Sequence, residues 1–478
     1  MNYDKILEKI QPSLEERNQI HQIYTKVINT LETIISDKGI DAKVSLVGSV
    51  AKETFLSGKS DIDIFIRFPL ETDAKKLKRY GLDISYKCIN KLNGKAEEHY
   101  ASHPYLTGII NGYEIDFVPC YDIKDASQLK SAVDRTVLHT KYVKKHLKEE
   151  QKAEVLLLKK FMDEVGVYGS EFKTGGFAGY LCEILILEYG SFENVLENSQ
   201  YWKYGTKLDL EDYGTWGNFK DPLVFIDPTD KNRNVGAALR IERMIDFIIA
   251  SRNYLDEDDE DKKLEYFYPL QKENISKEGI VDSFKRRGNH NLVLRFRIPD
   301  FPQDSLYPQF KKTLDSFTLK LEKEEFKVFK SDYWSDDEEY AFFVFELNVS
   351  RQTNYKIHLG PKIWNKISCT NFKNAHKDKD IYILDEYLVF NALREFKTAD
   401  SFISHVLTEE NIHKIKVGKN LLDNLINESS LMSLYEFLDS DSFENYKFKG
   451  EFLNFLDDFL NPNQYIIRWS FNFFPKTL

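Results

Sequence analysis

The sequence predicts a multidomain protein of the α+β class that begins with a small mixed sheet and its helices. Up to about residue 140, apolar residues recur by turns at helical and at strand spacing. Helical spacing then dominates from 133 to 253, and strand patterns return after the acidic run at 256–261. A chain of 478 residues has room for roughly two to four domains.

The first part of the chain contains the elements of one α/β module. Ser13 and Glu16 are spaced as a capping box, and the apolar residues after them predict a helix to about Ser36. A second helix is predicted over 73–92. Alternating apolar residues predict strands at 43–47, 62–67, 97–99, 105–110 and 114–119. Helices packed on a mixed sheet would form a module of about 140 residues.

The remaining elements are predicted from the same two periodicities. Helices are predicted at 152–162, from Gly175 onward, at 237–249 directly after 233–236, at 309–324 and again after Thr398. Strands are predicted at 292–298, 326–330, 340–350, 386–390 and 391–396. The aromatic residues near the end are typical of a packed helix and strand: Phe452, Phe455, Phe459, Trp469, Phe471, Phe473 and Phe474.

The composition narrows the class of protein. Hydrophobic residues make up 42% of the chain, but no run approaches the 18 or so apolar residues of a membrane span. The N-terminus opens a polar helix rather than a signal peptide. The four cysteines are scattered and form no Cys-x-x-Cys pair, so neither a zinc site nor a disulfide framework is expected. A reducing, cytoplasmic location fits this usage.

The net charge of −11 argues at first against a nucleic-acid partner. The position of the charges matters more than their sum. Lysine and arginine gather at 141–148, 285–287, 295–297 and 311–312. Such clusters are usually solvated faces, but a protein that binds a phosphate backbone needs them, so they permit an RNA partner.

Two acidic residues, Asp61 and Asp63, are the most informative in the chain. Asp63 lies in the strand predicted at 62–67 and Asp61 directly precedes it, so alternation puts both carboxylates on one face. Neighbouring carboxylates repel each other unless a cation lies between them, and Mg²⁺ favours such oxygen ligands. About a dozen residues earlier, Gly48 permits close approach of the backbone to a phosphate, and Ser49 offers a hydroxyl and an amide.

A third carboxylate, Asp116, lies in the strand predicted at 114–119. If this strand lies beside the first, Asp61, Asp63 and Asp116 converge. Three carboxylates can hold two metal ions about 4 Å apart, one for an attacking hydroxyl and one for a leaving pyrophosphate. Standing alone, Asp-x-Asp on a strand is more often a solvated face. The upstream Gly-Ser turn and the third carboxylate favour nucleotidyl transfer instead.

The combination resembles the polymerase β-like nucleotidyltransferase superfamily, and more closely its archaeal-type (class I) CCA-adding enzymes, the tRNA nucleotidyltransferases. The likeness runs from about residue 10 to 430. It rests on segments in the same order: 131–136 with His139 and Lys141, 166–173, 176–183, 227–230 with 233–235, 306–309, 358–361 and 417–420. Several motifs in order are more specific than any single one of them.

The resemblance implies template-independent addition of C, C and A, from CTP and ATP, to the 3′ end of tRNA. Asp61, Asp63 and Asp116 would be the catalytic carboxylates and would bind two Mg²⁺ ions. The residues expected to bind the nucleotide are Gly48, Ser49, Lys52, Thr136, His139, Lys159, Tyr168 and Arg233. Of these, Arg233 would lie near the incoming base. The family often forms homodimers.

The resemblance also supplies names for the predicted domains. They are a catalytic polymerase β-like head (1–142), a helical neck with the central nucleotide-binding domain (143–255), an α+β body and tail of RNA-binding type (256–385) and a C-terminal body segment with its extension (386–478). The chain departs from the family pattern where Asp61 stands for a common Glu, Lys52 for a common Arg and Val137 for a usual proline.

Apart from the resemblance, most of these residues have an ordinary structural interpretation. Lys159 could be a lysine at the edge of an apolar helix stripe, Tyr168 a half-buried core residue, and Arg233 a helix-start partner of Asp230. Two other functions stay open. One is a signalling nucleotidyltransferase that makes oligonucleotides or modifies another RNA or a protein. The other is an RNA-binding protein on an inactive transferase scaffold.

Overall fold

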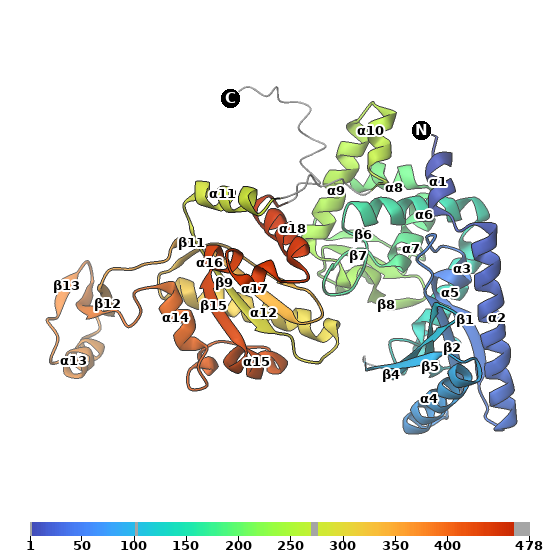
Figure 1. Ribbon diagram of the computed structural model, residues 1–478, viewed down its shortest axis with the longest axis horizontal. Coiled ribbons are helices and arrows are strands. Elements are labelled where there is room, and N and C mark those ends of the chain that lie inside the picture. Colours follow the sequence, from blue (N-terminus) through green and yellow to red (C-terminus); the bar gives the residue numbers. More distant parts are fainter. Residues whose placement is uncertain (1, 101–103, 269–275, 463–478) are drawn as a thin grey trace. The chain divides into compact units, whose positions relative to one another are not determined.

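The computed structural model describes residues 2–100, 104–268 and 276–462, which fall into two compact units (Figure 1). The first unit holds the described residues up to 268 and the second those from 276 to 462. The division into four domains stays a prediction. Trp469 and the three phenylalanines after it lie outside the described residues. In the described part, no helix has the length and apolar character needed to cross a membrane.

A five-stranded mixed sheet forms the centre of the N-terminal part, as predicted. Its order is β1 (Lys43–Val47), β2 (Ile62–Phe68), β5 (Tyr113–Tyr121), β4 (Pro104–Ile110) and β3 (Lys95–Tyr100). Only β2 and β5 pair in parallel, and the other neighbours are antiparallel. This central parallel pair is visible in Figure 1 and is the pair that carries the predicted carboxylates.

Helices α2 (Leu14–Asp37) and α4 (Ala74–Lys91) pack on one face of this sheet. The isoleucines of β2 and alternate residues of β5 point into this core, as the period of two predicts, and Ile64 and Phe117 are fully buried. The predicted capping box is only half formed. Ser13 Oγ accepts from the amide of Glu16, but the Glu16 carboxylate accepts from Ser57 and from the amide of Gly58.

The part of the first unit beyond the sheet is mainly helical and has an aromatic core. Its larger helices are α5 (Arg135–His146), α6 (Glu149–Glu164), α7 (Gly179–Tyr189), α8 (Phe192–Ser199) and α9 (Ile241–Asp256), and α1 (Asp4–Ile10) packs against the same core. The ring of Phe161 lies within about 6 Å of the rings of Phe192, Phe247, Tyr254 and Phe267.

Three short strands interrupt this region, which the sequence predicted as mainly helical. They are β6 (Thr206–Leu208), β7 (Leu223–Asp227) and β8 (Asp230–Asn234). The prediction that Arg233 directly precedes a helix over 237–249 was wrong, because Arg233 lies in β8 and α9 begins at Ile241. The run from Asp230 to Asn234 has no apolar residue, so the alternation that identifies a strand is missing.

The second unit is built on a four-stranded antiparallel sheet. Its order is β10 (Lys327–Ser335), β11 (Tyr340–Val349), β9 (His290–Arg297) and β15 (Ser429–Ser433). On one face lies α12 (Gln303–Lys323), whose Phe310 and Phe317 contact Phe343. On the other lie α11 (Lys277–Arg287), α16 (Leu434–Leu438) and α18 (Lys449–Leu460). The sequence missed β15 because only two of its five residues, Leu431 and Met432, are apolar.

A smaller sheet follows within the second unit. Strands β12 (Tyr355–Lys362), β14 (Tyr387–Leu393) and β13 (Tyr382–Leu384) carry α13 (Lys366–Ala375). The two strands predicted at 386–390 and 391–396 are one strand, β14. The predicted return of helices after Thr398 is confirmed by α14 (Ala399–Val406) and α15 (Leu422–Asn427).

The aromatic core gives a first testable prediction. Phe161→Ala should lower the free energy of unfolding of the first unit by about 3–5 kcal/mol, because loss of the fully buried ring leaves a cavity among the aromatic rings around it. Tyr201→Ala, at a tyrosine that is 74% exposed, is the matched control and should change it by less than about 0.5 kcal/mol. Urea unfolding followed by circular dichroism measures both, and equal effects would contradict the assignment of this core.

Candidate active site

The two strands that carry the predicted carboxylates are parallel neighbours, and their register places Asp63 beside Asp116. Neighbouring strands lie about 4.8 Å apart, so the two side chains leave the sheet side by side on one face. Asp61 precedes β2 by one residue and follows the same alternation. The three carboxylates are therefore brought to one end of β2, on the face opposite the α2 and α4 core.

These carboxylates are close enough for their negative charges to repel one another. Burial, then the negative charges of Asp116 and Asp61, raise the pKa of Asp63 to about 7, while Lys52 acts in the opposite direction. Asp116 is oriented from the next strand, since its Oδ1 accepts a hydrogen bond of 2.5 Å from Thr107 Oγ1. A carboxylate with a raised pKa and a second carboxylate beside it are typical of a functional site.

Gly48 is required by the position of Asp63. It opens α3 (Gly48–Lys52) with φ of +74°, and a Cβ built on it would lie 2.0 Å from Asp63 Oδ2. Its amide donates to Thr140 Oγ1 of α5 over 3.3 Å, and the Thr140 hydroxyl donates to the carbonyl of Thr136. Ser49 follows in α3 and is partly exposed. The structure thus brings the predicted Gly48, Ser49 and Thr136 to the same edge as Asp63.

Two predicted cations, Lys52 and Lys159, share one buried carboxylate. Glu183 of α7 accepts from Lys52 Nζ over 2.5 Å and lies 3.5 Å from Lys159 Nζ, and all three side chains are at most 7% exposed. Thr54 completes the cluster, with its hydroxyl on Glu183 and its carbonyl on Lys159 Nζ at 2.7 Å. Lys159 is thus fully buried in an ion-pair cluster, and not a lysine at the solvent-exposed edge of the apolar face of its helix.

The charges of this cluster do not balance. Burial alone would raise the pKa of Glu183, yet Lys52 and Lys159 outweigh it and hold the pKa below its ordinary value. Burial lowers the pKa of Lys159 and the positive charge of Lys52 adds to the shift, while Glu183 at 3.5 Å acts in the opposite direction. Two ammonium groups over one carboxylate leave a net positive charge behind α3, and Lys52 is close enough to act on Asp63.

A second buried carboxylate, Asp227, organises the other predicted residues. Its Oδ2 lies 2.8 Å from His139 Nε2 and accepts from Arg233 over 2.8 Å. Since an ionised carboxylate only accepts, Nε2 of His139 carries the proton. Burial lowers the pKa of His139, so the ring stays neutral, and it stacks on Tyr180 with 3.8 Å between ring centroids. Arg233 is paired with Asp227 and not with Asp230, which pairs with Arg135.

Tyr168 lies next to the Lys159 cluster. A Cβ added to Gly179 would lie 3.1 Å from the Tyr168 hydroxyl and 3.6 Å from Lys159 Nζ, so both side chains meet over that glycine. Burial raises the pKa of Tyr168, and Glu183 and Asp61 add to the shift. All the nucleotide-binding residues predicted from the sequence therefore lie in the first unit, in three connected groups around Asp63, Glu183 and Asp227.

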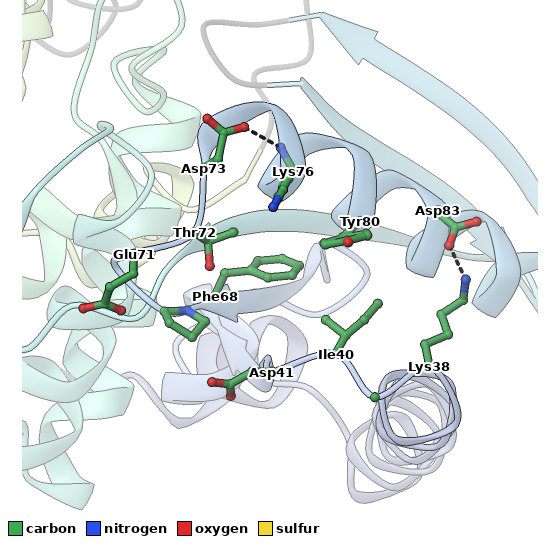
Figure 2. A pocket seen from close by; sticks show the side chains of 12 residues that line it. Lys38, Ile40, Asp41, Phe68, Glu71, Thr72, Asp73, Lys76, Tyr80 and Asp83 are labelled. Atoms are coloured by element: carbon green, nitrogen blue, oxygen red, sulfur yellow. Dashed lines mark hydrogen bonds and ion pairs between the residues drawn. The ribbon is translucent and has the colours of Figure 1, made fainter.

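The opposite end of β2 opens into a different kind of space (Figure 2). A pocket of about 620 Å³ is lined there by Phe68 and Tyr80 and by side chains of both charges. Asp83 pairs with Lys38 at 2.5 Å, and Asp73 accepts from the amide of Lys76 as the cap of α4. Asp73 and Asp83 thus already have partners. Among the described residues that line this pocket, no two carboxylates lie side by side on neighbouring strands. The paired carboxylates mark the Asp63 end as the candidate active site.

Among the described residues, no group of three or more His, Cys, Asp or Glu side chains is arranged to hold a metal ion as it stands. The chemistry of the set at Asp61, Asp63 and Asp116 nevertheless fits a hard divalent cation. The ligands are carboxylate oxygens on one face, and a cation would remove the repulsion that raises the pKa of Asp63. Binding requires rotation of these side chains on a backbone that already places them together.

Sequence reasoning assigned no role to four residues of this site: Thr107, Tyr180, Glu183 and Asp227. Three of them lie inside segments that were quoted for the resemblance, namely 176–183 and 227–230. For Glu183 a weak signal was present, because a Glu within an apolar helix is rarely buried without a charged partner. Two partners of Glu183, Lys52 and Thr54, are 129 to 131 positions away in the sequence, which no local pattern reveals.

Comparison with known families agrees with the fold. A mixed sheet with paired carboxylates on adjacent parallel strands is the arrangement predicted for a nucleotidyltransferase, and residues 28–139 match the family model of the nucleotidyltransferase domain. Residues 153–268 match the second domain of tRNA nucleotidyltransferase, and residues 287–433 match the C-terminal domain of CCA-adding enzyme. The chain belongs to the family of the CCA-adding enzymes, which confirms the resemblance.

Similar proteins align over most of their length. The CCA-adding enzyme of Methanothermobacter thermautotrophicus is 44% identical over 461 residues, which cover 96% of this chain and 98% of that protein. The CCA-adding enzyme of Methanosarcina barkeri is 37% identical and covers 87% and 90%. That of Pyrococcus abyssi is 32% identical and covers 93% and 99%. Similarity therefore extends across both units.

The pKa of Asp63 gives a prediction about stability. Because the pKa is about 7 in the folded protein and 3.8 ordinarily, the protonated carboxyl favours folding at low pH, and this stability is lost as the pH rises from about 4 to 7. Asp63→Asn should therefore stabilise the metal-free protein at pH 8 by roughly 2–4 kcal/mol and have a much smaller effect at about pH 4. Urea unfolding in EDTA at both pH values measures this. If Asp63→Asn changed the free energy of unfolding equally at both pH values, Asp63 would not be subject to repulsion from neighbouring carboxylates.

Proposed function

We propose that this protein adds C, C and A to the 3′ end of tRNA, from CTP and ATP and without a nucleic-acid template. The observation that carries the proposal is the register of β2 and β5, which sets Asp63 beside Asp116. It is supported by the near full-length similarity to CCA-adding enzymes. The reaction is nucleotidyl transfer, in which the 3′-hydroxyl of tRNA attacks the α-phosphate and pyrophosphate leaves.

The proposed catalytic residues are Asp61, Asp63 and Asp116, and they would hold two Mg²⁺ ions. When bound, such ions activate the attacking hydroxyl and neutralise the triphosphate. The chain contributes the positions of the ligands: β2 and β5 fix Asp63 and Asp116, and Thr107 holds Asp116. Positioning of this kind supplies most of the catalysis in phosphoryl transfer.

The triphosphate is proposed to lie over α3, where Gly48 and Ser49 offer backbone amides and a hydroxyl. Lys52 and Lys159 lie behind this turn with Glu183, and their excess positive charge attracts the phosphates. We propose that Lys52 turns toward the phosphates when nucleotide binds, while Lys159 keeps Glu183 neutralised. The buried cluster then has two states that differ in the partner of Lys52.

The base and the sugar are proposed to contact the group around Asp227. One guanidinium nitrogen of Arg233 is held by Asp227. The side chain is 34% exposed, so its other nitrogens would be available to the base. Thr136 and Tyr168 would line the same pocket. The ring of His139 is held by Asp227 and Tyr180 and is neutral. It would therefore contact the nucleotide through its planar surface and not through a positive charge.

The rival function, a transferase that makes oligonucleotides without an RNA acceptor, predicts a different product. The wild-type protein is incubated with Mg²⁺ and labelled CTP or ATP, each alone and mixed, with and without tRNA that lacks its three terminal nucleotides. We expect two C residues from CTP alone, a complete CCA from the mixture and no product without tRNA. Equal incorporation in the absence of any RNA would favour the rival.

Loss of one carboxylate should stop the reaction without unfolding the protein. Asp116→Asn should lower kcat by at least about 10³-fold, because the lost charge stabilises the transition state by several kcal/mol. Asp122→Asn is the matched control: this residue lies just beyond the other end of β5 and pairs with Arg67, so kcat should stay within about threefold of the wild type. Incorporation by Asp116→Asn at the wild-type rate would refute the assignment.

The contact proposed for Arg233 predicts a change in nucleotide choice. Arg233→Lys keeps a positive charge beside Asp227 but removes the planar fork, so discrimination between CTP and ATP should fall by about tenfold or more. Arg135→Lys, which keeps its pair with Asp230, is the control and should leave discrimination unchanged. The measurement is kcat/KM for each nucleotide on tRNA ending in CC. Unchanged discrimination in Arg233→Lys would place Arg233 away from the base.

A further inference from the structure

Glu183 and Lys52 form an ion pair that has to open before Lys52 can contact a phosphate. In the structure, Oε2 of Glu183 accepts a hydrogen bond of 2.5 Å from Lys52 Nζ. The side chain of Lys52 is 7% exposed, whereas that of Glu183 is completely buried. Lys52 is therefore the member of the pair that can change its partner, and Glu183 stays where it is.

The two oxygens of Glu183 have different partners. Oε1 accepts from the hydroxyl of Thr54 over 2.6 Å and lies 3.5 Å from Lys159 Nζ, while Oε2 binds Lys52. Lys159 is also fixed by the carbonyl of Thr54, at 2.7 Å. When Lys52 departs, Glu183 keeps one hydroxyl and one ammonium group, and the remaining pair has no net charge. The cluster can thus release Lys52 without leaving a buried carboxylate alone.

The backbone that carries Lys52 is fixed, so a change of partner involves the side chain alone. Lys52 ends α3, and Glu53 after it has a left-handed φ of +56° and pairs with Lys152 of α6. Across this turn, the amide of Thr54 donates to the carbonyl of Ser49 over 3.0 Å. Lysine carries its ammonium group on a flexible four-carbon stem. Rotation of that stem is sufficient to move the charge from one partner to another.

The charge of Lys52 already acts on the carboxylate site. Burial and the neighbouring carboxylates raise the pKa of Asp63, and Lys52 opposes them. Lys52 Nζ also lies 5.9 Å from the ring centroid of Tyr180, the ring that stacks on His139. A phosphate held near Asp63 is therefore within the electrostatic reach of Lys52, and it competes with Glu183 for one ammonium group.

We propose that Glu183 is a positioning residue that takes Lys52 back from the leaving pyrophosphate and so speeds its release. The inference rests on the proposed function, in which pyrophosphate leaves after each transfer. While the triphosphate is bound, Lys52 contacts it and Lys159 balances the charge of Glu183. After transfer, the buried carboxylate competes for Lys52 at close range, which weakens the hold on pyrophosphate. Release of product limits the rate of many enzymes, so this competition affects turnover.

A Glu183 that only holds Lys52 ready for the triphosphate predicts the opposite effects. In that case loss of the carboxylate would leave Lys52 without support, and ATP and pyrophosphate would both bind more weakly. KM for ATP would rise and no step after the transfer would become slower. The sign of the change in affinity therefore distinguishes competition for Lys52 from support of Lys52.

The test uses Glu183→Gln in the full-length protein, with Glu346→Gln as the matched control. Glu346 is equally buried and pairs with Arg287, but it lies in the second unit. Both substitutions replace a buried carboxylate by an amide of nearly the same shape. Isothermal titration measures Kd for pyrophosphate and for ATP with Mg²⁺ and without tRNA. Quench-flow measures AMP transfer to tRNA ending in CC, and thermal unfolding verifies that both variants fold.

We expect Glu183→Gln to bind pyrophosphate and ATP about tenfold more tightly than the wild type, because Lys52 has lost the competing carboxylate. AMP transfer should show a burst in the first turnover that the wild type lacks, followed by turnovers about tenfold slower, so that kcat and KM for ATP fall together. Glu346→Gln should leave both Kd values within about twofold of the wild type. Unchanged or weaker pyrophosphate binding by Glu183→Gln would overturn the inference.

A second variant decides the matter if Glu183→Gln does not fold. Thr54→Val keeps the carbonyl that binds Lys159 but removes the hydroxyl that donates to Glu183. Glu183 then depends more strongly on Lys52, so ATP and pyrophosphate should bind about threefold more weakly. Thr54→Val with unchanged or tighter binding would contradict competition for Lys52.

The binding and transfer measurements separate this inference from the proposed function. If the wild type does not extend tRNA but Glu183→Gln binds pyrophosphate more tightly, the competition for Lys52 stands and the proposed function fails. If the wild type extends tRNA and Glu183→Gln shows neither tighter binding nor a burst, the proposed function stands and the role of Glu183 is overturned.

Discussion

The structure depends first on one unfavourable contact, the approach of Asp63 to Asp116. The fold enforces it, because both strands continue into a core of isoleucine and phenylalanine that fixes their register. A slip by one residue would exchange the carboxylates with Ile64 and Phe117 and bury two charges. Core packing therefore sustains a repulsion that is visible in the raised pKa of Asp63, and a divalent cation is the ligand that relieves it.

The helical region supplies the opposite arrangement. Glu183 and Asp227 are buried acids near the three carboxylates. Glu183 pairs with Lys52 and Lys159, and Asp227 binds His139 and Arg233. Removing Glu183 would leave buried positive charge without a partner, which costs more than the pair contributes, and removing Asp227 would leave the ring of His139 and the guanidinium of Arg233 without their acceptor. These ion pairs hold side chains in place around the candidate active site. Cohesion of the first unit comes mainly from its aromatic core.

Much of this was accessible from the sequence, and the reason is physical. Alternation within a strand is a local property. It therefore predicted which side chains of β2 and β5 share a face and, given that the two strands are neighbours, that the three carboxylates converge. The half-formed cap at Ser13, the strand that contains Arg233 and the strand β15 did not follow. In two of these cases the decisive partner is distant: Glu16 bonds to Ser57 and Gly58, and β15 is held by β9. The strand with Arg233 pairs with the neighbouring β7, but it has no apolar residue that would identify it as a strand. Local propensity carries no information about such partners.

The charge of the chain illustrates the same limit. A net charge of −11 describes the field at long range, which salt screens within about 10 Å. A phosphate backbone that reaches the surface feels only the charges within that distance, and beside α12 these are lysines clamped in place by Gln309, Thr313 and Ser316. The sequence showed Lys311 and Lys312 as a short cluster, whereas folding adds Lys414 and Lys416 from a hundred residues away. An acidic protein can thus have a locally basic surface, because folding and not composition decides which charges are neighbours.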